Sequence, residues 1–426
     1  MGKLNELTGL EAAAKIANRE ISSVELVNDC LEQISSREND VGAWQYLDPE
    51  NAISEARRLD DLEPIGPLHG VPFGVKDVID TGEMPTEYGS EIFSGNQPHE
   101  DAACVSIMRE AGGVLLGKTV TTEFAVYQWR KTRNPHNIQH TPGGSSSGSA
   151  AAVGDNMVPL AFGNQTAGSL IRPASFCGVH AFKPTHGTSD LRGIFEMVPR
   201  FDTLGYMARS VDDLVTFYSV VSKDKVIPHT LEELDKPPRI GICRTHFWDE
   251  AQTETVAAVE SAASLLANSG CHVADCNLPN SFSNLAKTHT TILNAGLARS
   301  MSSIRQSYEK QISEQLLEIL NKGLSTSAEE IVEAFTHADK CMAEFPTITA
   351  DFDVLLTPSA PGEAPEGWAT GNPIFQIMWT LLQVPCLTLP WTTGPNGLPV
   401  GIQLIGRKGS DKKLLRVAKW IENVKS

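Results

Sequence analysis

Several features that mark membrane, secreted or nucleic-acid-binding proteins are missing from this sequence. No run reaches the roughly 18 consecutive apolar residues of a membrane span. Residues 1–17 show an amphipathic helix pattern without the continuous apolar segment of a signal peptide. The net charge is −17 and there is no basic tract, which disfavours binding to nucleic acid or anionic lipid. We expect a cytoplasmic protein with neither nucleic acid nor membrane as a partner.

Recognisable metal and nucleotide motifs are also absent. The eight cysteines are scattered without a CxxC pair, so we expect buried reduced thiols rather than a disulfide framework. His136 and His140 have the spacing of two zinc ligands on a helix, but they lie beside prolines and have no evident third ligand. No GxGxxG occurs, and no glycine-rich stretch continues as GK[ST]. We therefore expect no metal and no cofactor.

What the chain does contain is an alternation of apolar runs and helical patterns. The runs are bounded by turns and predict buried strands: 113–118, 239–243, 272–276, 353–358, 386–390 and 399–406. Helical periodicity lies between them, at 103–112, 210–221, 254–269 and 411–425. This alternation predicts an α/β sandwich with helices on both faces of a sheet.

The chain shows no internal repeat and no long linker, so we expect a single domain over residues 1–426. Residues 7–37 predict two N-terminal helices, separated near Asn18 to Glu20, with Ser22 or Ser23 as the N-cap of the second. Residues 285–347 are mostly helical without strand character. We interpret this segment as a cap over the core or as the interface of a homodimer.

Three stretches combine glycine, proline and polar residues in a way that a purely structural segment does not need. They are GVPFGVKDVID (70–80), GGSSSGSAAAV (143–153) and GNQTAGSLIRPASFCG (163–178). Taken alone, Lys76 in the first is either a surface lysine paired with Asp77 or a buried base with a lowered pKa. The glycine-rich stretches are either turns or backbone nests that bind an oxyanion. Composition leaves both alternatives open.

Two other serine motifs compete for the role of nucleophile. Gly144 to Gly148 matches the nucleophile elbow GxSxG with Ser146 at its centre, but the preceding residues NPHNIQHTP favour a loop over the required strand. Ser307 to Lys310 matches SxxK without its companion motifs, in a polar helical region. We interpret both as structural.

Together the three stretches resemble the amidase signature family, whose hallmark is a Gly/Ser-rich motif. The match runs without a gap across GGSSSGSAAAVGDNMVPLAFGNQTAGSLIRPASFCGVHAFKPTHG (143–187). Further segments resemble the family in the same order: 67–77, 201–213, 353–365 and 397–418. The resemblance therefore covers most of the chain, with a signature core at about 65–215. It implies the family's fold, an α/β/α sandwich with a central mixed β-sheet covered by helices on both faces.

Carried over position by position, the resemblance implies a Ser–cis-Ser–Lys triad of Ser169, Ser145 and Lys76. The backbone N–H groups of Thr166, Ala167, Gly168 and Ser169 would form the oxyanion hole. It implies a serine hydrolase that cleaves a C–N bond of a small-molecule linear amide, or of a urea or carbamate. An acyl-enzyme on Ser169 would release a carboxylate and ammonia or an amine.

The motif departs from the family at four positions. Gln165 stands where the family often has aspartate, Ala167 and Ser147 replace glycines, and the motif's arginine appears one position later, as Arg172. All three triad positions are retained. We expect the chemistry to be retained and the surrounding hydrogen bonds to differ.

The resemblance leaves the substrate and two rival functions open. Candidate substrate-binding residues are apolar or aromatic: Tyr127, Trp129, Phe375, Met378 and Trp379, which can equally be core. One rival is the glutamine-hydrolysing subunit of a tRNA-dependent amidotransferase, although 426 residues is shorter than we expect for that role. The other is a non-catalytic binding protein on the same fold.

Overall fold

The apolar runs form one mixed sheet of eleven strands in the computed structural model, which describes residues 3–222 and 229–425. The strands are β1 (Trp44–Leu47), β2 (Pro72–Lys76), β3 (Val114–Thr119), β4 (Leu160–Gln165), β5 (His180–Lys183), β6 (Thr203–Ala208), β7 (Arg239–Ile242), β8 (His272–Asp275), β9 (Val354–Pro358), β10 (Cys386–Thr393) and β11 (Pro399–Ile405).

The helices separate these strands along the chain. They are α1 (Gly9–Ala17), α2 (Ser23–Val41), α3 (Pro49–Asp60), α4 (Ala103–Glu110), α5 (Ser147–Gly154), α6 (Ile171–Phe176), α7 (Val211–Val221), α8 (Thr253–Asn268), α9 (Leu285–Ser300), α10 (Ser302–Tyr308), α11 (Glu314–Ser325), α12 (Ala328–Ile348), α13 (Ile374–Leu381) and α14 (Asp411–Lys425). Short 3₁₀ helices occur at Leu4–Glu6, Glu91–Phe93, Glu123–Ala125, Trp248–Glu250, Asn280–Phe282 and Glu309–Gln311.

The strand order is β1-β3-β2-β4-β6-β5-β10-β11-β9-β7-β8. Strands β3, β2 and β4 are mutually parallel, as are β9, β7 and β8, and antiparallel pairs join these two groups. The sheet is therefore mixed, as predicted. The pairing of β2 with β4 brings the stretch at 70–80, which contains Lys76, next to the stretch at 163–178.

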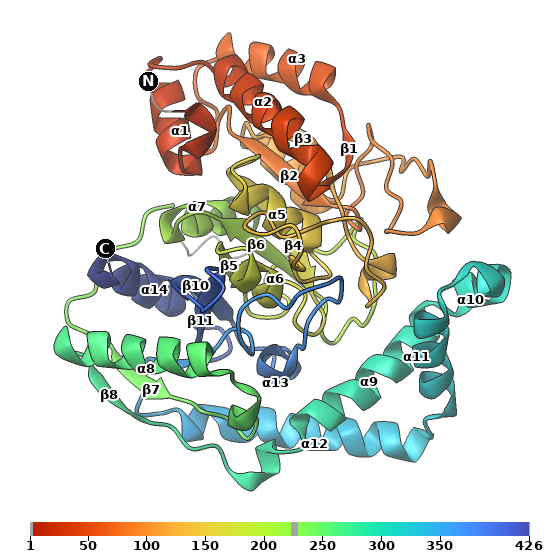
Figure 1. Cartoon of the computed structure of the whole chain (residues 1–426), viewed down its shortest axis with the longest axis vertical. Coiled ribbons are helices and arrows are strands. Elements are labelled where there is room, and N and C mark those ends of the chain that lie inside the picture. The colour runs from red at the N-terminus through yellow and green to blue at the C-terminus, as the bar shows by residue number, and fades with distance from the viewer. Residues whose placement is uncertain (1–2, 223–228, 426) are drawn as a thin grey trace.

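Helices cover the sheet in two groups. α5 and α6 contact each other and pack on β4 and on β5, β10 and β11. In the second group, α14 contacts both α7 and α8 (Figure 1). α7 packs on β5 and β6, α14 packs on β10, and α8 packs on β9 and β11. Strands β2, β4, β6 and β9 are buried along their whole length because both faces are covered. The α/β/α sandwich predicted from the alternation of elements is confirmed.

The N-terminal helices begin where the sequence places hydroxyl N-caps. Thr8 caps α1 and Ser22 caps α2, each in a capping box with a glutamate three residues later. Between the helices, Arg19 has a φ of 58°. These two helices and α3 lie at the top of the view in Figure 1, where α3 packs on β3 and α2, and α1 contacts α7.

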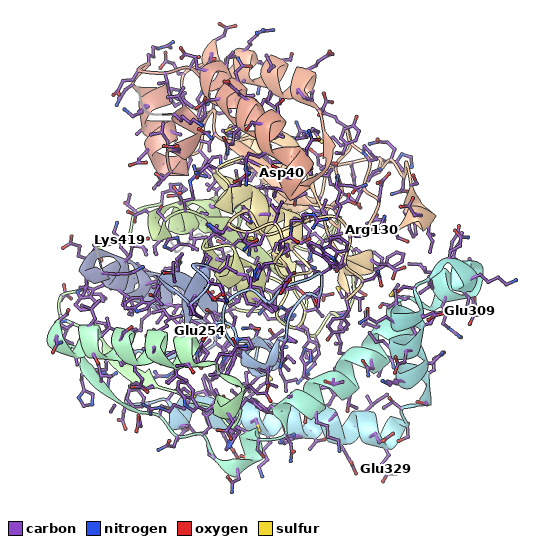
Figure 2. All side chains as sticks on the ribbon, viewed as in Figure 1. Asp40, Arg130, Glu254, Glu309, Glu329 and Lys419 are labelled. Atoms are coloured by element: carbon purple, nitrogen blue, oxygen red, sulfur yellow. The ribbon has the colours of Figure 1, made fainter. Side chains whose placement is uncertain are left out.

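Residues 285–347 fold into α9 to α12, which extend along the bottom and right of the molecule in Figure 1. α9 contacts both α11 and α12, and also α13 near the sheet. Figure 2 shows Glu309 at the outer end of this unit and Glu329 on its lower edge. Among the described residues, no helix is long and apolar enough to cross a membrane.

Candidate active site

Lys76 ends the buried strand β2 and is itself fully buried. Its Nζ lies 2.6 Å from Ser145 Oγ and 2.5 Å from Asn164 Oδ1, the latter on the neighbouring strand β4. Burial lowers the pKa of Lys76 well below its ordinary value, and the charge of Asp202 opposes this only in part. A neutral amine in this position can donate to Asn164 Oδ1 and accept a hydrogen bond from the Ser145 hydroxyl. The arrangement can therefore supply a base and its first proton donor.

Ser145 is buried at the start of the second stretch, and the Gly144–Ser145 peptide bond is cis, as the resemblance implied. The carbonyl oxygen of Gly144 accepts a hydrogen bond of 2.6 Å from Arg172 Nη2. A Cβ on Gly144 would lie 2.8 Å from Thr370 Cγ2, so any larger residue here would force the Thr370 side chain to move. These contacts hold the peptide unit that precedes Ser145, whose Oγ contacts Lys76 Nζ.

Ser169 follows β4 in the loop that leads into α6 and is partly exposed, unlike Lys76 and Ser145. Its carbonyl oxygen accepts a hydrogen bond of 3.1 Å from the amide of Ser146, which joins the two serine-bearing loops. Ser169 also lines a narrow pocket with a volume of about 30 Å³. The three residues therefore run from a buried lysine to a serine at a pocket.

The loop from Thr166 to Ser169 has all four carbonyl groups hydrogen-bonded. Their donors are His289 Nε2 at 2.8 Å, Thr380 Oγ1 at 2.7 Å, the Arg172 amide at 3.2 Å and the Ser146 amide at 3.1 Å. Within the described residues, the amides of Ala167, Gly168 and Ser169 donate no hydrogen bond. With the carbonyls held elsewhere, these amides are available to an oxyanion.

Thr166 is fixed by two residues that the sequence analysis did not single out. Asp202 Oδ1 accepts from Thr166 Oγ1 at 2.6 Å, and burial raises the pKa of Asp202 to about 7 against the hydrogen bonds that lower it. His289 on α9 stacks on Phe201, and burial lowers its pKa to about 4. Because a carbonyl oxygen only accepts, His289 is protonated at Nε2. Asp202 lay within a quoted family segment, whereas nothing local marked His289.

Two of the four departures from the family motif, Gln165 and Arg172, have clear structural roles. Gln165 Oε1 accepts from the amides of Leu170 and Ile171, both at 3.1 Å, and its Nε2 donates to Thr380. The Arg172 guanidinium is buried and donates from Nε to Thr370 O and from Nη2 to Gly144 O. Gln165 thus holds the start of α6, and Arg172 holds the loop before Ser145.

The competing motifs do not form sites. Ser146 is fully buried, its Oγ bonds Asn164 O, and the fully described segment 120–146 contains no strand to support an elbow. Ring nitrogens of His136 and His140 bond the backbone carbonyls of Cys177 and Ala364, respectively. No group of three or more potential metal ligands occurs among the described residues.

The predicted substrate-binding residues separate into two sets. Tyr127 lines the pocket at Ser169. Trp129 stacks on Trp368 and donates to Thr132 O. Phe375, Met378 and Trp379 are buried on α13, where Trp379 packs on Phe345. These last four residues are described, and none lines this pocket; residues that the sequence analysis did not name do so instead: Ala125, Val126, Met197, Leu293, Leu297 and Pro373.

Comparison with known proteins shows which family this chain resembles over most of its length. A family model described as Amidase matches residues 25–415. One subunit of the glutamyl-tRNA(Gln) amidotransferase of Chloroflexus aggregans is 30% identical over 477 residues, covering 100% of this chain and 97% of that protein.

Solved structures are similar over the whole chain. One described as an amidase has a TM-score of 0.91 and 28% identity, covering 99% of this chain and 100% of that chain. The native peptide amidase of Stenotrophomonas maltophilia has a TM-score of 0.85 and 28% identity, with 99% and 97% covered.

Proposed function

Because the chain belongs to the amidase signature family, hydrolases that act on C–N bonds, we propose that it is a serine amidase cleaving small-molecule linear amides through an acyl-enzyme on Ser169. The observation that carries the proposal is the 2.6 Å contact between the buried Nζ of Lys76 and Ser145 Oγ, in a loop that is hydrogen-bonded to the loop of Ser169, which lines a pocket. Ureas and carbamates share the same acyl-transfer chemistry.

In the first half-reaction, Ser169 Oγ attacks the carbonyl carbon of the amide. Its proton passes to Ser145 Oγ as Ser145 gives its own proton to the neutral amine of Lys76. The negative charge that develops on the carbonyl oxygen is stabilised by the amides of the 166–169 loop, a contribution of about 10²–10³-fold per donor in comparable sites.

The same relay then runs in reverse. Protonated Lys76 returns a proton through Ser145 to the nitrogen of the leaving group, the C–N bond breaks, and ammonia or an amine departs. Water attacks the ester on Ser169 while Lys76 again accepts a proton through Ser145. The carboxylic acid product leaves, and Ser169 regains its hydroxyl proton.

The test is covalent labelling with a fluorophosphonate, followed by intact mass measurement and peptide mapping. We expect one adduct, on Ser169, that is lost in Ser169→Ala and strongly slowed in Lys76→Ala. Ser146→Ala is the matched control, because Ser146 is buried beside the site without a role in the relay. An adduct on Ser146, or labelling unaffected by Lys76→Ala, would contradict the triad. No adduct in a folded sample would favour the non-catalytic alternative.

A second function is favoured by a specific observation, the 30% identity to an amidotransferase subunit over nearly its whole length. The alignment runs over 477 positions and this chain has 426 residues, so at least 51 positions of the alignment have no counterpart in this chain, which is the shorter of the two as expected. In this case the triad would release ammonia from glutamine within a complex. Glutamine hydrolysis that appears only when a partner subunit is added would support this function. Hydrolysis of simple amides by the chain alone would support the stand-alone amidase.

A further inference from the structure

One face of α9 contacts the oxyanion loop and lines the pocket at Ser169. His289 donates to the carbonyl of Thr166 at 2.8 Å. Leu293 and Leu297 follow His289 at the i+4 and i+8 positions, so they lie on the same face of the helix, and both line the pocket. Leu293 is 8% exposed and Leu297 is fully buried. The helix therefore places two leucine side chains beyond the residue that contacts the loop of the nucleophile.

Glycines let α9 pack closely on both of its sides. A Cβ on Gly296, on the pocket face, would lie 2.9 Å from Val198 Cγ2. On the opposite face, a Cβ on Gly323 of α11 would overlap the carbonyl oxygen of Asn294 and lie 2.8 Å from Ala298 Cβ. α9 is thus held between the segment at 197–198 and α11. Because interiors are close-packed, the helix cannot move away from the pocket without disrupting the packing of α11.

Met197 forms an adjoining wall whose backbone is also fixed. Its amide donates to Asp202 Oδ2 at 2.8 Å, and its carbonyl oxygen accepts from Ser300 Oγ of α9 at 2.8 Å. Its sulfur lies 3.4 Å from Thr166 Oγ1, so this side chain lies against the oxyanion loop. Further apolar walls come from Ala125, Val126 and Pro373. The pocket therefore has rigid and mainly apolar walls.

Apart from Tyr127, the polar side chains that line the pocket lie at the oxyanion loop. Thr166 and Ser169 belong to this loop, and a Cβ on Gly168 in the same loop would lie 3.0 Å from Arg172 Nη1. The pocket has a volume of about 30 Å³. A cavity needs about 10–15 Å³ to hold one water-sized group, so there is room for about two such groups, for example a methyl and a methylene.

We propose that Leu293 and Leu297 are specificity-determining residues that limit the acyl chain, so that the preferred substrates are primary amides of acids with about two or three carbons, such as acetamide and propanamide. The inference rests on the proposed amidase function. In a primary amide all carbon beyond the carbonyl belongs to the acyl chain, and this chain enters the pocket that Ser169 lines. A methylene gained or lost in an apolar pocket changes kcat/KM by about 10–200-fold.

The rival explanation is that the two leucines only pack the core and that the acyl chain lies outside this pocket. Chain length would then have little effect on the rate, or longer apolar chains would bind better because they bury more surface.

The first test uses the native protein and needs no substitution. Ammonia release is measured from acetamide, propanamide, butanamide and hexanamide, which differ only in the length of the acyl chain. We expect kcat/KM to be highest for acetamide or propanamide, about ten-fold lower or more for butanamide, and about 100-fold lower or more for hexanamide. Equal rates, or rates that rise with chain length, would overturn the inference.

The second test removes the leucines one at a time. In Leu293→Ala and in Leu297→Ala the ratio of kcat/KM for hexanamide to that for propanamide should rise by about ten-fold or more, because each substitution lengthens the pocket. Leu297→Val removes less volume, so it should give an intermediate ratio, and it still tests the inference where an alanine variant does not fold.

Leu285→Ala is the matched control. Leu285 is a described residue of the same helix that is fully buried but does not line the pocket, so its loss lowers stability without lengthening the pocket. A ratio that is unchanged in the variants of Leu293 and Leu297, or that rises equally in Leu285→Ala, would overturn their role.

The two proposals fail in different ways. A Ser169 adduct together with ammonia release that does not depend on chain length overturns the acyl subsite and leaves the amidase proposal standing. Where turnover is slow, protection of Ser169 from the fluorophosphonate by propanamide but not by hexanamide supports the subsite, and equal protection overturns it. Neither ammonia release nor an adduct overturns both proposals.

Discussion

At the scale of single residues, the state of Lys76 depends on which groups face its Nζ. The neighbours are Ser145 Oγ and the amide oxygen of Asn164, both neutral. A lysine acts as a base only when it is unprotonated, that is, above its own pKa. We therefore expect kcat/KM to fall as the pH decreases through the pKa of Lys76.

Asn164→Asp tests this dependence. A carboxylate in place of the amide oxygen that now lies 2.5 Å from Nζ stabilises the protonated lysine and raises its pKa. We expect the acidic limb of the profile of kcat/KM against pH to shift to higher pH by about one pH unit or more. Asn164→Ala is the control: it removes an acceptor without adding charge, so it should lower the rate without that upward shift. An unmoved limb in Asn164→Asp would exclude Lys76 as the base.

Asp202 gives a second prediction at this scale, on stability. Burial raises its pKa to about 7 in the folded protein, above its value in the unfolded chain. Between about pH 4 and 7 the folded state therefore binds more protons than the unfolded state, and this residue's contribution to stability falls as the pH rises. In Asp202→Asn, the decrease in the free energy of unfolding between these pH values should be smaller by on the order of 1–4 kcal/mol.

The measurement is urea unfolding of both proteins from pH 5 to 8. The substitution also removes a hydrogen-bond acceptor. The stability lost in this way does not vary with pH, because the asparagine side chain does not titrate. Parallel pH curves for the two proteins would show that Asp202 does not titrate as described.

At the scale of elements, α9 connects the peripheral helices to the oxyanion loop. His289 lies in this helix and donates to the carbonyl of Thr166, while Leu293 and Leu297, one and two turns later, line the pocket. The helix is thus part of the site although His289 lies 123 residues after Thr166 in the chain.

His289→Ala tests whether this contact positions the loop. Loss of the donor frees the Thr166 carbonyl, and we expect kcat to fall about ten-fold or more with a smaller change in KM. His289→Gln, whose amide can donate in place of Nε2, should recover part of kcat. Thr290→Ala is the matched control, because Thr290 is exposed on the same helix and bonds only Ala286 O. Equal behaviour of the Ala and Gln variants would indicate a packing role alone.

The elements also show where local pattern was sufficient. The six predicted strands are all present, since each is a short apolar run with turn residues on both sides. The six predicted runs do not include β1, β2, β4, β5 or β6. The sequences of β4, β5 and β6 contain glycine, asparagine, histidine and threonine, and these segments are strands because neighbouring strands pair with them on both sides.

At the scale of the whole molecule, burial in the core determines how fast the cysteine thiols react. All eight cysteines are free and buried, as predicted from their scatter. Burial raises the pKa of several, for example to about 12 for Cys30 and Cys104. We expect the native protein to react with a disulfide reagent such as DTNB far more slowly than the unfolded protein, which should show eight thiols. Rapid reaction of one thiol in the native state would identify an exposed site that the structure does not have.

By itself the sequence determined the alternation of elements, the hydroxyl cap of α2, and the three stretches that contain Lys76, Ser145 and Ser169. These features depend on residues close together in the chain or on sequence motifs that occur in a fixed order. Only the tertiary structure decided that Lys76 is buried against Asn164, that His289 reaches the oxyanion loop, and that Phe375, Met378 and Trp379 are core while Leu293 and Leu297 face the pocket. The reason is physical: burial, pairing and the pKa of a lysine are set by atoms that sheet pairing and helix packing bring together from distant parts of the chain.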